Sequence, residues 1–187
     1  MKAIRRPIIP ISAYLLRPRI ALCVCLFAMS LPSLSHAEAL DDASIRALYA
    51  EDNAFADDNK KEAAFLSKRL DDGFVATAHI MQRENGATPK SIVETDTKAE
   101  LIEQTASDEL HYETKKSSYN ISSIQYSKDH TYAVVTYSVT EKGIITTGNN
   151  SANYESAEAC VEKVELVGNL LRKMQAECNV NIALSDR

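Results

Sequence analysis

The stretch CVEKVELVGNLLRKMQAEC, residues 160–178, decides the fold of this chain. The turn signal Gly168-Asn169 divides it into two strand-like halves, and each cysteine lies nine residues from Asn169. Two antiparallel strands that fold back at such a turn bring their residues into cross-strand pairs. Cys160 and Cys178 then lie opposite each other, so the stretch predicts a hairpin closed by a disulfide.

The same hairpin predicts an inner and an outer face. With Asn169 as the midpoint, Val164 lies opposite Met174 and Glu165 lies opposite Lys173. Because side chains alternate along a strand, the cysteines and the apolar pair share one face and the charged pair lies on the other. A two-residue turn would shift the register by one and separate the cysteines onto opposite faces. The disulfide therefore predicts a loop of odd length.

The first 37 residues have the composition of a secretory signal peptide. Residues 1–37 contain five basic side chains and no acidic one, and the apolar run 20–29 is followed by small residues up to Ala37. That is the order of a charged, an apolar and a cleavage region. The pattern predicts a signal peptide over 1–37 with cleavage before Glu38, and a second possible site lies before Leu40.

An uncleaved membrane anchor is the alternative for this segment. A membrane-spanning helix needs roughly 20 apolar residues, and this run is shorter before Pro32 interrupts it. Cys23 and Cys25 lack the small preceding residue that lipoprotein processing requires. We therefore expect no stable membrane anchor and a periplasmic or secreted protein of the bacterial envelope, where cysteines can oxidise.

The remaining residues, 38–187, are numerous enough for one domain with its own core. The leader holds 5 of the 21 Lys and Arg residues and none of the 26 Asp and Glu residues, which leaves 16 basic and 26 acidic side chains. The formal net charge of this part is therefore −10. Such a surface repels phosphate groups, so nucleic acid is not an expected partner.

Hydrophobic periodicity and turn residues predict helices first and strands afterwards. Two helices are expected over 41–59 and 60–70, and a capping-box spacing at Thr97 and Glu100 predicts the start of a third. A loop or loose hairpin is expected over 82–95. The expected strands cover residues 74–81, 119–126, 131–140, 153–167 and 170–184. This order predicts an α+β fold in which a curved antiparallel sheet packs on three N-terminal helices.

Several short motifs in this order resemble the nuclear transport factor 2-like superfamily, notably its SnoaL-like and ketosteroid isomerase-like branches. They are AFADDN at 54–59, DGFV at 72–75 and SKDHTYAVV at 127–135, within a resemblance that spans 40–184. Gly73 and the Asp129-His130 turn depart from the family pattern. The resemblance implies a cone-shaped fold that dimerises through its sheet, and its members include cofactor-independent isomerases, cyclases and dehydratases.

Asp52 and Tyr137 are the candidate site residues. Asp52 falls on the apolar face of the first expected helix, where a desolvated carboxylate acts as a general base. Its alternative role is to pair with a buried arginine or backbone group. Tyr137 lies on the expected inner face of its strand and offers a phenolic donor to a ligand oxygen. Three further tyrosines are weaker candidates, because strand tyrosines commonly bury the ring alone: Tyr112, Tyr132 and Tyr154.

No motif for a cofactor or a metal is present. The histidines at 79, 111 and 130 lack paired ligand spacing, and no glycine-rich phosphate loop occurs. The favoured function is binding, either of a small apolar ligand in the cone or of a protein partner on the sheet. One alternative is a cofactor-independent isomerase, cyclase or dehydratase with Asp52 as base and Tyr137 as donor. Another is an envelope interaction or assembly protein without a pocket.

Overall fold

The computed structural model describes residues 38–54, 58–107, 110–147 and 150–186. The predicted signal peptide, residues 1–37, lies outside these described residues. Three helices and six strands follow in the order α1 (Asp42–Ala54), α2 (Asn59–Arg69), β1 (Leu70–Glu84), β2 (Lys90–Thr97), α3 (Lys98–Ala106), β3 (Leu110–Tyr126), β4 (Tyr132–Thr147), β5 (Asn150–Val167) and β6 (Leu170–Asp186).

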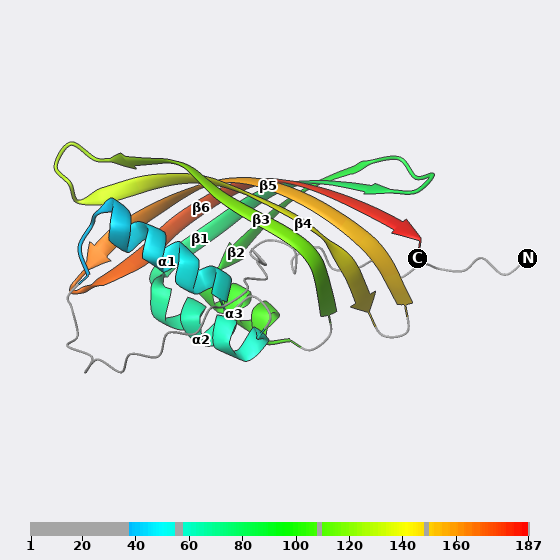
Figure 1. The fold of residues 1–187 in the computed structure, drawn as a ribbon, viewed down its shortest axis with the longest axis horizontal. Coiled ribbons are helices and arrows are strands. Elements are labelled where there is room, and N and C mark those ends of the chain that lie inside the picture. Colours follow the sequence, from blue (N-terminus) through cyan, green and yellow to red (C-terminus); the bar gives the residue numbers. More distant parts are fainter. Residues whose placement is uncertain (1–37, 55–57, 108–109, 148–149, 187) are drawn as a thin grey trace, which may run out of the picture.

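The strands form one sheet in the order β2-β1-β6-β5-β4-β3. The sheet is curved, and the helices lie on its concave side (Figure 1). This arrangement confirms the predicted α+β cone on three helices. The sheet is mixed rather than wholly antiparallel, because β1 runs parallel to β6 while every other neighbouring pair is antiparallel.

The helices begin where the sequence supplies side-chain caps. Asp58 accepts a hydrogen bond from the Lys61 backbone N–H at the start of α2. The predicted capping box is formed at α3, where Thr97 and Glu100 each accept a hydrogen bond from the other's backbone N–H. These bonds satisfy donors that the first helical turn leaves free. The caps therefore fix where both helices start.

Several strands are longer than predicted, and β4 also continues beyond the predicted end at Thr140 to Thr147. Residues 82–95 form most of a hairpin rather than a loop, with β1 reaching Glu84 and β2 starting at Lys90. Gly86 at the turn has a φ of 73°, a conformation that favours glycine. β3 begins at Leu110, before the predicted start at Tyr119. The extensions of β1, β2 and β3 are polar, and pairing with a neighbouring strand holds them in the sheet.

The β5–β6 hairpin confirms the cysteine pairing and corrects the register around it. Cys160 pairs with Cys178 and the two form a disulfide. The loop is the two-residue turn Gly168-Asn169, so the prediction of an odd-length loop was wrong. The extra residue is instead Met174, which forms a bulge: Lys163 pairs with Gln175, but the next residue, Val164, pairs with Lys173.

The bulge changes which residues of β6 face the core: odd-numbered residues point inward before it and even-numbered residues after it. Between the turn and the bulge, Leu171 and Lys173 are buried; beyond it, the even-numbered residues from Ala176 to Leu184 are buried. Lys173 therefore points inward opposite Val164, and the prediction that it lies outside opposite Glu165 was wrong. The register of β1 also shifts beside this bulge, between Leu70 and Val75.

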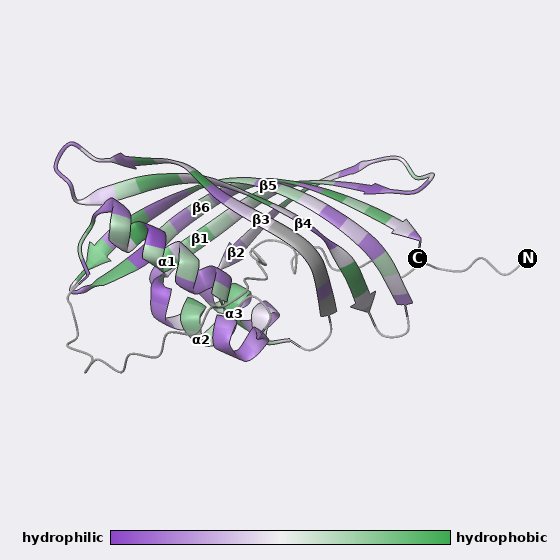
Figure 2. Cartoon of the chain, viewed as in Figure 1, coloured by the Kyte–Doolittle hydropathy of each residue, from purple (hydrophilic) through white to green (hydrophobic). Residues whose placement is uncertain are grey.

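The inner face of β4 is the predicted one. Its buried residues include Ala133, Val135, Tyr137 and Val139. Apolar and polar residues alternate along the strands, as expected for a sheet with one covered face (Figure 2). Within the described part of the chain, the helices are too short and too polar to cross a membrane.

Candidate functional site

Lys173 is the centre of a polar cluster between α1 and the sheet. Its ammonium nitrogen, Nζ, donates a hydrogen bond to Asp52 Oδ2 on α1 at 2.7 Å and lies 3.3 Å from Glu162 Oε2 on β5. Lys173 is 2% exposed and Glu162 is fully buried. One buried cation is thus shared by two carboxylates from different elements, and the Met174 bulge is what turns it towards them.

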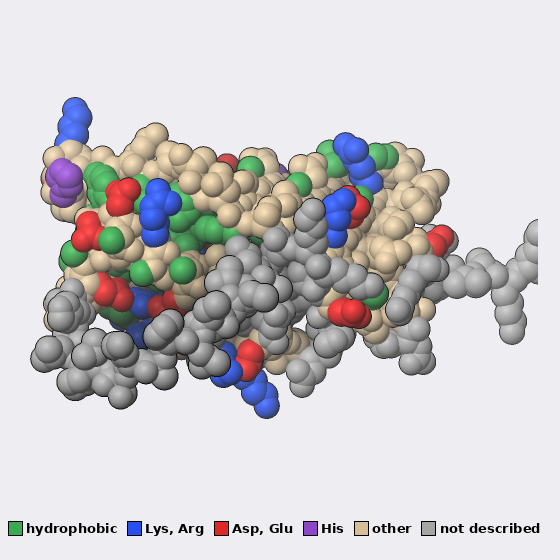
Figure 3. All heavy atoms as spheres, in the orientation of Figure 1, with side chains coloured by type: hydrophobic (Ala, Val, Ile, Leu, Met, Phe, Trp, Pro, Cys, Tyr) green, Lys and Arg blue, Asp and Glu red, His purple; other side chains and the backbone are tan. Residues whose placement is uncertain are grey.

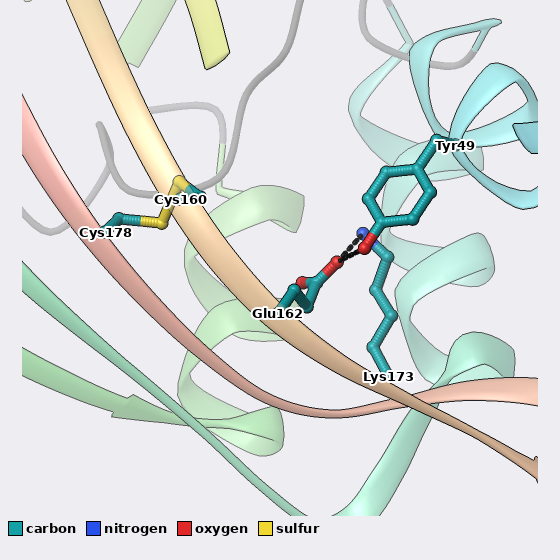
Figure 4. The surroundings of a disulfide bond; sticks show 5 residues. All are labelled: Tyr49, Cys160, Glu162, Lys173 and Cys178. Atoms are coloured by element: carbon teal, nitrogen blue, oxygen red, sulfur yellow. Dashed lines mark hydrogen bonds and ion pairs between the residues drawn. A yellow bond between two sulfur atoms is a disulfide. The ribbon is translucent and has the colours of Figure 1, made fainter. Parts of the chain in front are cut away.

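Asp52, Glu162 and Lys173 form what we call the ion cluster, and three tyrosine rings pack beside it. Tyr49 on α1 donates a hydrogen bond from its hydroxyl to Glu162 Oε2, and the Lys173 ammonium lies 4.7 Å from the centre of its ring. The Tyr49 ring centre lies 5.3 Å from that of Tyr137 and 6.0 Å from that of Tyr119. Figure 4 shows Tyr49 and Lys173 converging on Glu162. We call Tyr49, Tyr119, Tyr137 and Glu162 the tyrosine cluster.

The charges in the ion cluster are not balanced if every group is ionised. Burial raises the pKa of Glu162, and the attraction of Lys173 opposes this shift. Burial alone would lower the pKa of Lys173, but the charges of Asp52 and Glu162 outweigh it and hold that pKa above its ordinary value. The lysine therefore stays charged, and its ammonium nitrogen lies closer to Asp52 Oδ2 than to Glu162 Oε2.

Two buried oxygens of the tyrosine cluster have no hydrogen-bond partner among the described residues. They are Glu162 Oε1 and the Tyr119 hydroxyl. Burial, and then the charge of Glu162, raise the pKa of Tyr119, so its hydroxyl keeps its proton and remains a donor. Buried polar groups in folded proteins are normally paired, and an unpaired one costs about 1–3 kcal/mol. These two atoms are therefore open to an additional partner.

The structure places the predicted site residues in different settings. Asp52 points inward as predicted, but it is paired with Lys173 rather than free. Tyr137 is buried on the inner face in the tyrosine cluster. Tyr154 also points inward, at a separate position where its hydroxyl lies 3.3 Å from Glu141 Oε2. Tyr132 packs under the ammonium of Lys163 away from the cluster, and the side chain of Tyr112 lies outside the described residues.

The sequence reasoning missed Glu162, Lys173 and Tyr119 as site residues. The inward direction of Glu162 could have been predicted, because Glu162 is two residues from Cys160 and side-chain alternation places both on one face of the strand. Lys173 was not, because its direction depends on the bulge at Met174. Tyr119 had no signal of its own in a polar strand.

No cluster of three or more His, Cys, Asp or Glu side chains suited to a metal ion occurs among the residues described. His79 lies 3.6 Å from Glu177, and both side chains are exposed. Charged side chains of both signs are scattered over the face shown in Figure 3.

The disulfide lies next to the ion cluster on the inner face of β5 and β6. Cys160 precedes Glu162 by two residues, and the Cys160–Cys178 bridge joins neighbouring strands beneath the helices (Figure 4). Such a bridge restricts the unfolded chain and stabilises a fold by a few kcal/mol. It anchors the strand that carries Glu162.

Comparison with known proteins identifies the fold. No family model and no curated protein sequence matches the chain. The structure is similar to an NTF2-like protein from Cytophaga hutchinsonii, with a TM-score of 0.50, 14% identity and coverage of 73% of this chain and 95% of that one. It is also similar to a putative calcium/calmodulin-dependent kinase II association domain from Exiguobacterium sibiricum, with a TM-score of 0.51, 12% identity and coverage of 81% and 97%.

A ketosteroid isomerase-like protein from Erwinia carotovora atroseptica is also similar. It has a TM-score of 0.47 and 13% identity, and the match covers 74% of this chain and 94% of that one. At these identities, similarity shows a common fold and no common chemistry. The helices on a curved sheet, together with the two matches at a TM-score of 0.50 or above, show that this chain has the nuclear transport factor 2-like fold.

Proposed function

We propose that this protein binds a small, largely apolar ligand that carries an oxygen acceptor, and that the ligand contacts the tyrosine cluster. The observation that carries the proposal is the pair of unpartnered buried oxygens, Glu162 Oε1 and the Tyr119 hydroxyl. A ligand oxygen that accepts from Tyr119 would remove the cost of leaving this donor unpaired.

The surroundings favour an apolar ligand body. The rings of Tyr49, Tyr119 and Tyr137 lie within stacking range of one another, and aromatic faces pack well against flat apolar groups. Both Lys173 and the Tyr49 hydroxyl approach Glu162 through Oε2, and Oε1 has no hydrogen-bond partner among the described residues. Burial raises the pKa of Glu162, so its acid form is more accessible than that of an exposed glutamate, and a proton on Oε1 would supply a second donor to the same ligand oxygen.

The test compares three ligands of similar shape: a bicyclic aromatic ketone, the parent hydrocarbon and the corresponding carboxylate. We expect the ketone to bind most tightly, as measured by calorimetry and by the rise in melting temperature. Tyr119→Phe should weaken ketone binding about tenfold, because one hydrogen bond is lost, and should leave hydrocarbon binding unchanged. Tyr132→Phe is the matched control, since Tyr132 lies outside the cluster.

Three results would contradict the proposal. The first is an absence of binding by all three ligands, in which case the two oxygens are satisfied by bound water. The second is equal affinity for the ketone and the hydrocarbon. The third is an equal loss of affinity in the Tyr119 and Tyr132 variants, which would place the ligand elsewhere.

The catalytic alternative, an isomerase, cyclase or dehydratase, requires more than the predicted pair of residues. Asp52 already accepts a hydrogen bond from Lys173, so proton abstraction by Asp52 would have to break a buried ion pair. Turnover of a bound ketone that is lost in Asp52→Asn, with binding retained, would favour this alternative. The remaining alternative is an envelope interaction or assembly protein without a pocket. It would gain support if none of the three ligands bound.

We also propose that the chain is exported and cleaved before Glu38. The Arg69 guanidinium is 5% exposed and donates to both carboxylate oxygens of Glu38 at 2.8 Å, and the Leu171 backbone N–H donates to the same carboxylate. Cleavage before Leu40 would remove this partner from a buried cation. Mass spectrometry of the secreted or periplasmic protein should therefore give a first residue of Glu38. Homodimerisation through the sheet remains a proposal, which light scattering would test.

A further inference from the structure

One side of α1 faces β3, the edge strand of the sheet. Asp42 Oδ1 accepts a hydrogen bond of 2.6 Å from the hydroxyl of Tyr126. Further along α1, the Tyr49 ring stacks with that of Tyr119, with 6.0 Å between the ring centres. Both of these partners belong to β3. Because Asp42 and Tyr49 are two helical turns apart, they lie on the same side of α1, and their contacts identify that side.

Arg46 lies between these two contacts on the same side of α1. It follows Asp42 by four residues and precedes Tyr49 by three, and residues at these spacings are neighbours on a helix surface. The pKa values of Tyr119 and Tyr126 agree with this placement. Burial raises both of them, and in each case the charge of Arg46 acts in the opposite direction. The guanidinium is therefore a positive charge beside the two tyrosines of β3.

The guanidinium of Arg46 is available to an anion from solution. Arg46 is exposed and makes no hydrogen bond or ion pair with any residue that the structure describes. The carboxylates at the start of α1 have other partners, since Asp42 accepts from Tyr126 and Asp41 accepts from the Ser44 backbone N–H. Arg46 therefore keeps its five N–H donors for a further acceptor.

Apolar side chains of β3 lie between its two tyrosines. They are Ile121 and Ile124, which pack against the core and keep part of their surface exposed. Figure 3 shows apolar side chains at the surface between α1 and β3. We call Arg46, Tyr119, Ile121, Ile124 and Tyr126 the α1–β3 seam. Tyr119 belongs to the seam and to the tyrosine cluster, because its ring is half-buried and its unpartnered hydroxyl is buried.

We propose that the ligand of the tyrosine cluster carries a carboxylate, which Arg46 binds at the α1–β3 seam. The ligand is then an aromatic keto acid. Its carbonyl oxygen accepts from Tyr119, its rings pack along the two isoleucines, and its carboxylate meets the guanidinium. A planar guanidinium matches the two oxygens of a carboxylate. Because Arg46 is exposed, the carboxylate stays at the surface and needs no buried space. This ligand class rests on the proposed function and adds a charge to its ligand.

A cationic ligand end is the alternative, because Asp41 and Asp42 are also exposed near the seam. Both carboxylates lie at the start of α1, where the helix dipole favours negative charge. Each already accepts a hydrogen bond, whereas Arg46 donates none to a described residue. The anionic end is therefore the better match to the seam.

The experiment uses α-tetralone, a bicyclic aromatic ketone, and two derivatives with a carboxylate or an ammonium on the ring remote from the carbonyl. Calorimetry measures their affinity for the oxidised protein. At low ionic strength the acid should bind about threefold to fivefold more tightly than α-tetralone, the gain expected from an exposed ion pair. High ionic strength should reduce this gain, because salt screens exposed charges.

Arg46→Gln should remove the gain in affinity and leave the binding of α-tetralone unchanged. Arg83→Gln is the matched control and should keep the gain. Arg83 is likewise exposed and without an ion pair among the described residues, but it lies on β1 and points away from the face that buries Gln82.

Failure of this ligand class is distinguishable from failure of the proposed function. If α-tetralone binds and Tyr119→Phe weakens it, but the acid binds no more tightly, the carboxylate is overturned and the proposed function stands. Tighter binding of the ammonium derivative would assign the seam to cations. An equal loss in the Arg46 and Arg83 variants would show attraction to the surface as a whole. If neither α-tetralone nor the acid binds, both proposals are wrong.

Discussion

Two glutamates on the same inner face of β5, Glu162 and Glu158, differ in the partners that the structure gives them. Glu162 and Glu158 are each two residues from Cys160, one on either side of it, and both are buried. Glu162 shares the ammonium of Lys173 with Asp52, whereas Glu158 has no cation among the described residues. Burial raises the pKa of both carboxyls, but only Glu162 has a positive charge that opposes the shift.

The difference originates in a single bulged residue rather than in the composition of either region. Met174 has no partner on β5, and the residue before it, Lys173, points inward as a result. A sheet face can therefore acquire a buried cation through a local change of register. The ion cluster is largely satisfied from within the protein, whereas Glu158 has no cation among the described residues.

The largest effect on this contrast is expected from Lys173→Met, which leaves Glu162, like Glu158, without a cation among the described residues. We expect the free energy of unfolding to fall by about 3–5 kcal/mol, because two buried carboxylates lose their cation. Denaturant unfolding at neutral pH measures this. Lys163→Met is the control and should cost less than about 1 kcal/mol, since Lys163 is partly exposed on the outer face. If the double variant Asp52→Asn/Lys173→Met were no more stable than the single one, the pairing would not be the cause.

Deletion of Met174 should have the next largest effect on the free energy of unfolding. Without the bulge, β6 cannot place Cys178 opposite Cys160 and also turn Lys173 inward. The protein should lose either the disulfide or the ion cluster, at a cost of about 3 kcal/mol. Thiol titration distinguishes the two outcomes, and denaturant unfolding gives the cost. Met174→Ala keeps the extra residue and serves as the control. An oxidised deletion variant of unchanged stability would show that the bulge is dispensable.

The smallest change in the free energy of unfolding is expected from Glu158→Gln, and this substitution should stabilise the protein rather than destabilise it. Because burial raises the pKa of Glu158 in the folded state, the native protein holds a proton that the unfolded chain releases as pH rises above about 4.5. The carboxyl therefore lowers stability progressively as pH rises towards the folded-state pKa. Glu158→Gln should remove this part of the pH dependence and raise stability at neutral pH by on the order of 1 kcal/mol.

Urea unfolding at a series of pH values, with Glu155→Gln alongside, measures this effect. A Glu158→Gln protein that is less stable than the parent at neutral pH would mean that the carboxylate is paired in the folded protein. In that case the contrast between the two regions would disappear.

Much of the fold followed from local sequence signals. The capping box at Thr97 and Glu100, the turn at Gly168 and the alternation in β4 are short-range patterns, and the structure has all three. The prediction of a loop or loose hairpin over 82–95 missed most of the strand residues there. Polar residues of β1 and β2 are held in the sheet because they pair with one another. Strand pairing of this kind depends on a neighbour, not on the residues themselves.

Less of the candidate site followed from the sequence. The inward positions of Asp52 and Tyr137 were predictable from helical and strand periodicity, and their partners were not. The ion pair joins Asp52 on α1 to Lys173 on β6, two residues far apart in the chain. A contact at that separation depends on how α1 packs against the sheet, which periodicity does not specify.

The sequence by itself determined that Cys160 and Cys178 share a face, because their equal spacing around a turn signal favours a disulfide between them. Seven residues separate Cys160 from the turn and eight separate the turn from Cys178, so one residue must be left without a partner. Whether that residue lies in the loop or within a strand was decided only by the tertiary structure. Because side chains alternate with a period of two, the spacing of the cysteines requires one unpaired residue somewhere in the hairpin. It does not say where in the hairpin that residue lies. In the sheet, where β6 pairs with β1 and β5, the unpaired residue is Met174. The bulge at this position turns the side chain of Lys173 into the core.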